Sequence, residues 1–235
     1  MVTLITLLVV PKRGNMADSA ETDQLRQAAT TLERSYDICL EFMDNALTLK
    51  DTETGRHSKR VTTFAICIAR DMQLSGEQIK TIARGAFVHD IGKLATPDAI
   101  LLKPTVLSAE EMAVMRQHCL RGFEILQKVP FLAEAAEIVY AHHEHYDGTG
   151  YPRGLKGEKI PLGARIVAIA NTVDAITSDL PYRRAQSVSA ARKEIRRCSG
   201  TQFDPAIVKT FLAQPETLWG GLSREIDKLM QAFPG

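Results

Sequence analysis

The sequence has little net charge, no membrane-length apolar run and no closely spaced pair of cysteines. Its 235 residues carry 29 Lys and Arg against 28 Asp and Glu, which gives a formal net charge of +1. A chain this close to neutral has no general attraction for nucleic acid or for an anionic membrane, so local charges must hold any anionic ligand. We therefore expect no nucleic acid polymer as a partner.

The only strongly apolar run, residues 1–10, is about half the roughly 20 residues that a membrane helix needs. No basic residue precedes it, and Lys12 and Arg13 follow it, which fits a secretory signal poorly. We expect no membrane insertion. A poorly ordered or non-native extension over residues 1–22 is the preferred interpretation, ahead of a strand-like piece packed on a partner or a membrane anchor.

The four cysteines are far apart in the sequence and form no CxxC pair: Cys39, Cys67, Cys119 and Cys198. The first three lie in helical patterns among apolar residues, so we expect free and mostly buried thiols. Thiols of this kind are typical of a reducing compartment, and we expect a cytoplasmic protein.

Period-two alternation is missing too, and no internal repeat or low-complexity segment is present. Apolar residues instead recur at helical spacing, and two capping-box patterns, Ser75 with Gln78 and Ser108 with Glu111, begin helices. We expect an all-α helical bundle. Helices are predicted over residues 23–50, 56–72, about 75–89, about 108–128, 131–143, 162–178, 187–198 and 205–213, with loops at 97–104 and 147–161.

The predicted organisation is an N-terminal helical extension followed by one domain. Residues 1–22 precede a long helix over 23–50, the domain covers 51–214, and a further helix is one option for the tail, 215–235. The long helix contains no glycine or proline, but its first half offers little to a compact core. Such an apolar stripe commonly pairs with another helix, so a homodimer through this segment is one option and a plain surface helix is the other.

The rest of the chain is organised around residues 87–93, which place His89 beside Asp90 after an apolar run, with Gly92 and Lys93 directly behind. Sets of histidine and carboxylate suit manganese, iron or zinc, and a carboxylate can bridge two ions. A lone His-Asp pair could be a hydrogen-bonded pair in a core, but a larger set predicts a metal site. That set uses five of the six histidines and two aspartates: His57, His89, Asp90, His118, His142, His143 and Asp174.

The order of these residues resembles the HD-GYP subgroup of the HD-domain metal-dependent phosphohydrolases. A bare His-Asp doublet is a weak signal, whereas the whole series in order, from about residue 35 to 214, is specific. The matching pieces are Glu53-Thr54-Gly55-Arg56-His57-Ser58-Lys59-Arg60-Val61, His89-Asp90-Ile91-Gly92-Lys93, His118, His142-His143-Glu144-His145-Tyr146-Asp147-Gly148-Thr149-Gly150-Tyr151-Pro152, Asn171-Thr172-Val173-Asp174-Ala175-Ile176-Thr177-Ser178-Asp179-Leu180-Pro181-Tyr182-Arg183 and Gly200-Thr201-Gln202-Phe203-Asp204-Pro205.

The resemblance implies a cofactor of two or three transition-metal ions, with iron or manganese preferred to zinc. Asp90 would bridge two ions, and Glu53, four residues before His57, would go with a third ion as in some members. A metal-activated hydroxide would then attack the phosphate. The remaining ligands would be His57, His89 and Asp174 on one ion, and His118, His142 and His143 on the other.

The resemblance also implies cyclic di-GMP as the substrate, opened to the linear dinucleotide pGpG with GMP as a further product in one alternative. Lys93, one turn past Asp90, would touch a phosphate oxygen. Tyr151 lies in a loop rich in glycine and proline and offers the substrate a ring face and a hydroxyl. Arg183 can donate two parallel hydrogen bonds to a phosphate or a guanine.

Asn171 departs from the family, which commonly has an aspartate three residues before the last ligand. Placed beside the ligands, it could retune the metal without abolishing binding. No implied metal ligand is missing, which argues against a degenerate domain that binds its ligand without hydrolysing it.

The alternatives left open are another substrate, such as cyclic GMP-AMP or a nucleotide, and a regulatory module that binds nucleotide or protein without turnover. The Gly150-Tyr151-Pro152 loop favours a cyclic dinucleotide.

Overall fold

The computed structural model describes residues 20–50, 54–179 and 183–232. Within these ranges the chain forms helices and loops and no strand, apart from an isolated bridge between Ser199 and Phe203. The predicted all-α class is confirmed. The elements are α2 (Ala20–Thr48), α3 (Thr54–Asp71), α4 (Gly76–Phe87), η1 (Ile91–Ala95), α5 (Asp98–Leu101), α6 (Ala109–Arg116), α7 (His118–Leu126), η2 (Pro130–Leu132), α8 (Ala133–Ala141), η3 (Gly157–Lys159), α9 (Leu162–Thr177), α10 (Val188–Arg197), α11 (Pro205–Ala213) and α12 (Glu216–Ala232).

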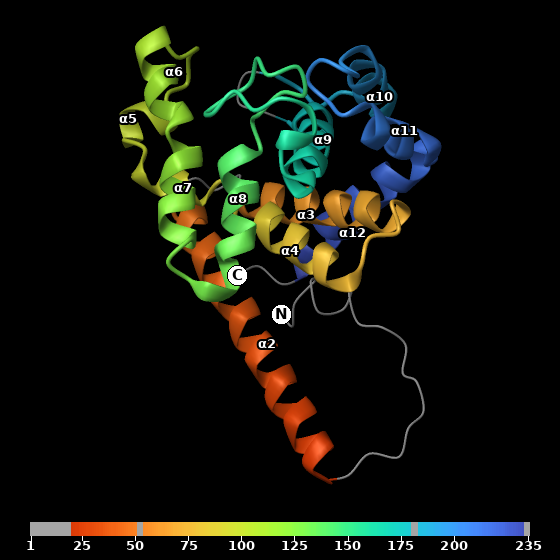
Figure 1. Ribbon diagram of the computed structural model, residues 1–235. Coiled ribbons are helices and arrows are strands. Elements are labelled where there is room, and N and C mark those ends of the chain that lie inside the picture. Colours follow the sequence, from red (N-terminus) through yellow and green to blue (C-terminus); the bar gives the residue numbers. More distant parts are fainter. Residues whose placement is uncertain (1–19, 51–53, 180–182, 233–235) are drawn as a thin grey trace.

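Helix α3 lies inside the bundle because its apolar residues recur on one face at helical spacing. Val61, Phe64, Ala65 and Ile68 are all fully buried. The helix packs against α4, α9, α12 and the end of α2, and Figure 1 shows it crossing beneath α9. Burial of a side chain such as Phe64 stabilises the fold by about 1.5–3 kcal/mol. Helix α3 therefore gives His57, near its N-terminus, a rigid support.

Helix α9 is apolar on most of its circumference and lies in the core for that reason. Ile166, Val167, Ile169 and Val173 are buried along it, and Asp174 follows in the last turn.

Among the described residues, no helix is both long enough and apolar enough to span a membrane.

The tail after Pro215 is helical and packs on the bundle as α12. Trp219 is fully buried, with its ring 5.7 Å from Phe64 and 4.8 Å from Phe211, measured between ring centroids. Asp227 on the same helix reaches Arg60 of α3, 3.3 Å between carboxylate and guanidinium. The last helix thus packs on α3, the helix that carries His57.

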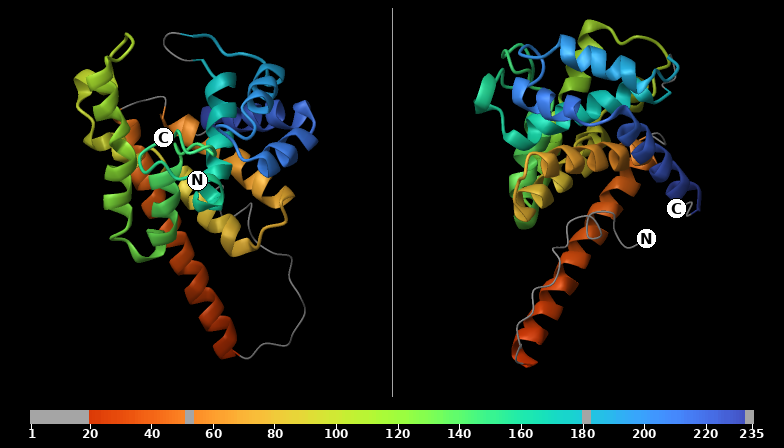
Figure 2. Two further views of the ribbon diagram at one scale, coloured as in Figure 1. Left: turned by 45° about the horizontal axis from the view of Figure 1, so that its top comes forward. Right: turned by 90° about the vertical axis from the view of Figure 1, so that its right-hand side faces the viewer.

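Helix α2 has a projecting N-terminal half and a docked C-terminal half (Figures 1 and 2). Leu40 and Leu47 are buried against the bundle, and Tyr36 stacks on Phe131 with 3.8 Å between ring centroids. The projecting half contributes little to the core, as its composition predicted.

The outer face of α2 stays exposed along its C-terminal half. Ile38 is 65% exposed, Phe42 75% and Leu49 90%, and their spacing places them along one side of the helix. Cys39 lies beside this stripe and is exposed as well, whereas Cys119 and Cys198 are buried. The expectation of a buried thiol was wrong for Cys39, because that side of α2 faces away from the bundle.

One helix predicted from Ser108 to about residue 128 is two helices in the structure. Helix α6 ends at Arg116 and α7 begins at His118. The capping box of Ser108 and Glu111 is present as expected, and so is that of Ser75 and Gln78. The prediction missed the break because Gln117 is an ordinary helix former. Tertiary packing decides instead, since α7 packs on η1 and α8 while α6 buries none of its residues.

Gly92 allows α7 to lie directly on η1. A Cβ atom on Gly92 would come within 1.9 Å of the His118 carbonyl oxygen and 2.5 Å of the Gly122 backbone nitrogen. Real Cβ contacts are much longer, and the atoms in the way belong to backbone. The glycine two residues after Asp90 is thus what brings His118 close to Asp90.

We expect Gly92→Ala to lower the free energy of unfolding by about 3 kcal/mol or more, because a rigid backbone would have to move. Urea unfolding followed by circular dichroism measures this. Gly76→Ala is the matched control, since nothing lies within 4 Å of a Cβ there. That variant should be neutral or stabilised by a few tenths to about 1 kcal/mol. Equal stability of the two variants would contradict the close approach of α7 to η1.

Candidate metal centre

Six of the eight predicted metal ligands converge from separate elements. Four of these six side chains are buried, and the other two, His57 and His143, are partly buried. His57 comes from α3, Asp90 from the junction of α4 and η1, and His118 from the first residue of α7. Glu53 lies outside the described residues. Two groups form, in each of which the candidate ligand atoms lie within 4.8 Å of one another: His57, His89 and Asp90, and His118, His142 and His143 with Cys119.

Asp90 lies between the two groups and turns one carboxylate oxygen toward each. Its Oδ2 is 3.4 Å from His89 Nε2 and 4.0 Å from His57 Nε2. Its Oδ1 is 3.6 Å from His118 Nε2. Burial alone would raise the pKa of Asp90, but Lys93 and the neighbouring histidines hold it well below its usual range. Asp90 is therefore an ionised carboxylate in the position of a bridging ligand.

Three of the histidines are oriented in the same way, by a backbone carbonyl three residues earlier. Nδ1 of His89 donates to the Ala86 oxygen at 2.8 Å, and Nδ1 of His118 to Met115 at 2.8 Å. His142 does the same to the carbonyl of residue 139 at 2.7 Å. A carbonyl oxygen only accepts, so each Nδ1 carries the proton and each Nε2 presents a lone pair to the site.

Nitrogen lone pairs consequently face each other at two places in the centre. His118 Nε2 is 3.3 Å from His142 Nε2, and His57 Nε2 is 3.2 Å from His89 Nε2. Burial lowers the pKa values of His118 and His142, so no imidazolium proton is available to join that pair. Facing lone pairs repel unless a cation lies between them. Neutral imidazoles with fixed Nε2 atoms and one shared carboxylate are the donor set that a pair of transition-metal ions requires.

We expect the metal-free protein to lose stability in mild acid. Burial lowers the pKa of His89 from 6.5 to about 4, and that of His143 to about 3. As the pH falls below about 6.5 the unfolded chain takes up these protons and the folded chain does not. Stability is therefore full above about pH 6.5 and is lost progressively toward about pH 3. Urea unfolding of chelator-treated protein across this range measures the loss, and His143→Gln should make the pH dependence shallower. A flat profile for the wild type would contradict the burial of neutral imidazoles.

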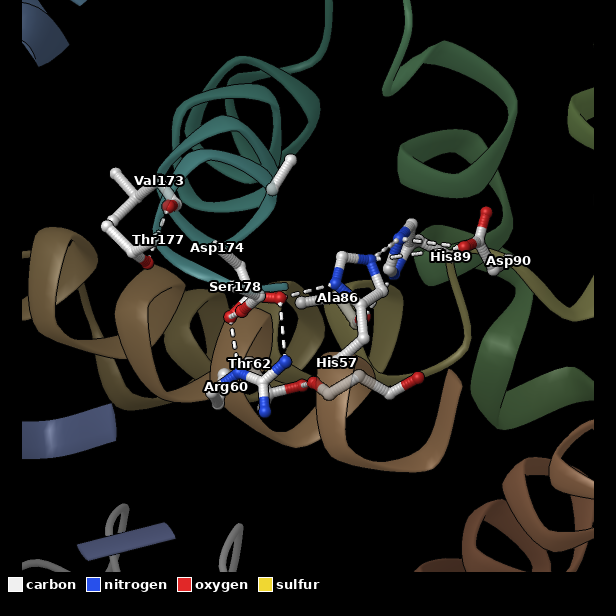
Figure 3. Close-up of polar contacts among 12 residues, drawn as sticks. His57, Arg60, Thr62, Ala86, His89, Asp90, Val173, Asp174, Thr177 and Ser178 are labelled. Carbon is white, nitrogen blue, oxygen red and sulfur yellow. Dashed lines mark hydrogen bonds and ion pairs between the residues drawn. The ribbon is translucent and has the colours of Figure 1, made fainter. Parts of the chain in front are cut away.

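Asp174 meets the centre through His57, as Figure 3 shows. Its Oδ2 accepts from His57 Nδ1 at 2.7 Å, and both of its oxygens accept from the Arg60 guanidinium, while Ser178 Oγ lies 3.3 Å from Oδ1. Burial raises the pKa of Asp174, but the bonds from His57 and Arg60 outweigh this and lower it. In this arrangement Asp174 orients His57, and its direct ligation of an ion stays a prediction. Sequence reasoning included Arg60 in a matching motif but assigned it no role, although its place three residues after His57 puts both on one side of α3.

Tyr151 stacks directly on the centre. Its ring lies 4.8 Å from the His143 ring, nearly parallel at 22°, and the Arg116 guanidinium lies 4.8 Å above the Tyr151 ring. Arg116 is exposed, so it offers a positive charge to an anionic ligand at the edge of the site. Sequence reasoning assigned no role to Arg116, and its position just before His118 was the available signal.

The loop that carries Tyr151 is fixed by Glu144. This buried side chain accepts from the backbone nitrogen of Arg153 at 2.7 Å and of Leu155 at 3.0 Å. Gly150 is required by close packing, because a Cβ there would lie 2.1 Å from the His145 nitrogen. The glutamate that follows His142-His143 thus connects the ligand pair to the loop.

The structure places Lys93 at the centre and Arg183 at the end of α9. Lys93 Nζ lies 2.6 Å from Asp90 Oδ2. The Arg183 guanidinium donates to the carbonyl oxygens of Ala175 and Ile176 at the end of α9. This contact caps the helix that carries Asp174, and the predicted contact of Arg183 with substrate stays a prediction.

A cavity of about 120 Å³ opens next to His142 and His143. Asn171 and Gln202 line it together with Thr172. Pockets for drug-sized ligands are larger, roughly 300–1,000 Å³, so this cavity admits only part of a ligand. Asn171, the position at which the sequence departs from the family pattern, therefore lies on a cavity wall beside the ligand pair.

A helical bundle in which an adjacent His89 and Asp90 meet histidines from three other elements has the features of an HD domain. A family model described as an HD domain matches residues 41–207, and the chain belongs to this family. The family predicted from the motifs is thus confirmed.

Relatives in the family carry phosphodiesterase names. The chain is 40% identical over 191 residues to a Thermotoga maritima protein named cyclic di-GMP phosphodiesterase, a match that covers 80% of this chain and 52% of that protein. It is 37% identical over 170 residues to a Vibrio cholerae protein named 3'3'-cGAMP-specific phosphodiesterase 2, covering 72% and 33%. The solved structure of a cyclic GMP-AMP specific phosphodiesterase from V. cholerae, V-cGAP3, has a TM-score of 0.58 at 21% identity, covering 82% of this chain and 54% of that one, and supports the fold. The chain spans about half, or less, of the length of these relatives.

Proposed function

We propose that this protein is a metal-dependent phosphodiesterase that hydrolyses cyclic di-GMP to linear pGpG. The observation that carries the proposal is the position of Asp90, whose two oxygens face two separate groups of histidines. Such paired sites suit hydrolysis of phosphate esters, because an anionic diester repels a nucleophile until its charge is neutralised. The name of the T. maritima relative supports cyclic di-GMP as the substrate.

The side chains of the centre have different roles according to their positions. The histidines of the two groups and Asp90 would hold the ions, which when bound supply the charge that activates water and polarises the phosphate. Backbone carbonyls fix the ring orientation of three of these histidines before any ion binds, so little rearrangement is needed. Lys93 and Arg116 add positive charge at the centre and at its edge, where a bound diester would lie.

The best-supported second substrate is cyclic GMP-AMP. The V. cholerae relative named for 3'3'-cGAMP is only slightly less similar than the one named for cyclic di-GMP. Hydrolysis of another nucleotide and a regulatory module without turnover are weaker alternatives, because the two histidine groups and Asp90 are all present.

The test is metal and product analysis on one preparation. Protein purified without air is analysed for iron, manganese and zinc, then incubated with cyclic di-GMP and with 3'3'-cGAMP, and the products are identified by liquid chromatography and mass spectrometry. We expect pGpG from cyclic di-GMP at the higher rate, and no product after chelation. Faster cleavage of 3'3'-cGAMP would establish the second substrate instead. Binding of cyclic di-GMP without any linear product, with iron or with manganese, would leave the regulatory module.

Tyr151→Leu is expected to raise the KM for cyclic di-GMP. Stacking of a base on an aromatic ring contributes about 1–3 kcal/mol, which corresponds to roughly fivefold to 150-fold. Tyr140→Leu is the matched control, because Tyr140 also stacks on a ring (Phe123, 4.8 Å) and lies under an arginine (Arg153, 4.4 Å), but belongs to neither histidine group. Metal content is measured in both variants, since the Tyr151 ring also supports His143. An unchanged KM would remove Tyr151 from substrate binding.

Two further parts of the proposal concern ions and assembly. Iron or manganese as the metals, and a third ion held with Glu53, follow from the sequence resemblance and stay predictions. A homodimer through α2 is supported by the exposed stripe of Ile38, Phe42 and Leu49, which a second copy of the helix would cover.

A further inference from the structure

Cys119 lies in the second histidine group, although no motif of the sequence pointed to it. It directly follows His118 on α7 and is fully buried. Its Sγ lies 3.5 Å from His118 Nε2. The sulfur and the ligand atoms of His118, His142 and His143 all lie within 4.8 Å of one another. A thiol and three imidazoles therefore surround one small volume.

The distances between these atoms match those between neighbouring ligand atoms of one metal ion. Metal–nitrogen bonds of about 2.0–2.1 Å and metal–sulfur bonds of about 2.3 Å place neighbouring nitrogens about 3.4 Å apart, and nitrogen and sulfur about 3.6 Å apart. The observed separations are 3.3 Å for His118 Nε2 to His142 Nε2 and 3.5 Å for His118 Nε2 to Cys119 Sγ. His118 and His142 are 3% and 1% exposed, and both aim a lone pair at this point.

The alternative role for Cys119 is simple packing in the core, with its S–H group donating a weak hydrogen bond to His118 Nε2. That role satisfies the lone pair of His118 but leaves the lone pair of His142 facing it. The other buried thiol, Cys198, lies outside the centre and donates to Glu194 at 3.4 Å, so burial of a cysteine in this fold does not by itself place sulfur among the imidazoles.

We propose that Cys119 is a further ligand, beside the bridging Asp90, to the ion held by His118, His142 and His143. On binding, the S–H bond breaks, its proton goes to solvent, and the thiolate sulfur bonds to the metal. A thiolate is a soft ligand, so this half of the centre takes zinc, iron or cobalt in preference to manganese. The inference shares its metal centre with the proposed phosphodiesterase but is independent of turnover.

Cobalt substitution tests the sulfur ligand directly. A thiolate bound to Co²⁺ gives an intense near-ultraviolet charge-transfer band, which nitrogen and oxygen ligands do not give. We expect the band in the wild type and in Cys198→Ser, and its loss in Cys119→Ser. We also expect the ratio of zinc to manganese affinity to fall by about tenfold or more in Cys119→Ser only. A wild-type spectrum without the band, or a band that survives in Cys119→Ser, would overturn the proposal.

X-ray absorption at the zinc edge of wild-type protein needs no variant and decides the matter if Cys119→Ser fails to fold. Sulfur in the first coordination shell supports the ligand, and nitrogen and oxygen alone overturn it. The outcomes also separate the two proposals. A sulfur ligand without hydrolysis would refute only the phosphodiesterase, hydrolysis without a sulfur ligand would refute only the role of Cys119, and failure to bind any ion would refute both.

Discussion

Replacing Asp90 with alanine is expected to remove both metal ions and to lower cyclic di-GMP hydrolysis by about a thousandfold or more. The reason is its position. Its two carboxylate oxygens face His89 on one side and His118 on the other, at 3.4 and 3.6 Å from their Nε2 atoms. No other described residue contributes an oxygen to both groups. Elemental analysis of protein purified without air measures the ions, and wild-type metal content in Asp90→Ala would refute the bridge.

Asp204→Ala separates loss of metal from loss of fold. Asp204 is as buried as Asp90 and also forms an ion pair, 2.5 Å between its Oδ2 and Arg165 Nη1, but it caps α11 away from the centre. Loss of a helix cap typically costs about 1 kcal/mol. We expect this variant to be less stable and to keep its metals. If both variants lost metal equally, unfolding rather than ligation would explain the result.

The elements of the fold were readable from the sequence where local chemistry determines them. Both capping boxes begin helices as predicted. Pro205 opens α11 at its predicted residue because Asp204 accepts a hydrogen bond from the backbone nitrogen of Ala206 in the first turn. The break at Gln117 was not readable, since it depends on the contact of α7 with Gly92, a residue far away in sequence. Propensity along one segment carries no information about such a contact.

The sequence predicted which residues belong to the site better than it predicted how their side chains are arranged. The order of histidines and aspartates identified the residues, and the structure brings six of them together. The direction of a long or branched side chain depends on packing, so the fork of Arg60 on Asp174 and the position of Arg116 over Tyr151 were beyond a motif. Cys119 was given no ligand role because its place among apolar residues predicted only a free, buried thiol.

Lys93→Met is expected to lower turnover of cyclic di-GMP by about tenfold to a thousandfold while the metals stay bound. Lys93 Nζ lies 2.6 Å from Asp90 Oδ2, at the place where a diester bound to both ions would develop negative charge. Methionine keeps most of the length of the side chain and removes only its charge. Steady-state kinetics, metal analysis and thermal melting on one preparation give the three measurements.

Lys103→Met is the matched control for Lys93→Met. Lys103 is similarly exposed, 29% against 24% for Lys93, and its Nζ also lies 2.6 Å from a carboxylate, that of Glu111, but outside the centre. It should keep full turnover. A fall in kcat for Lys93→Met with intact metals supports contact with the phosphate, because a lysine that only supported Asp90 would act through the ions. If Lys93→Met lost both its metals and its turnover, the role of Lys93 would be to keep Asp90 ionised. Wild-type turnover in Lys93→Met would remove Lys93 from the reaction.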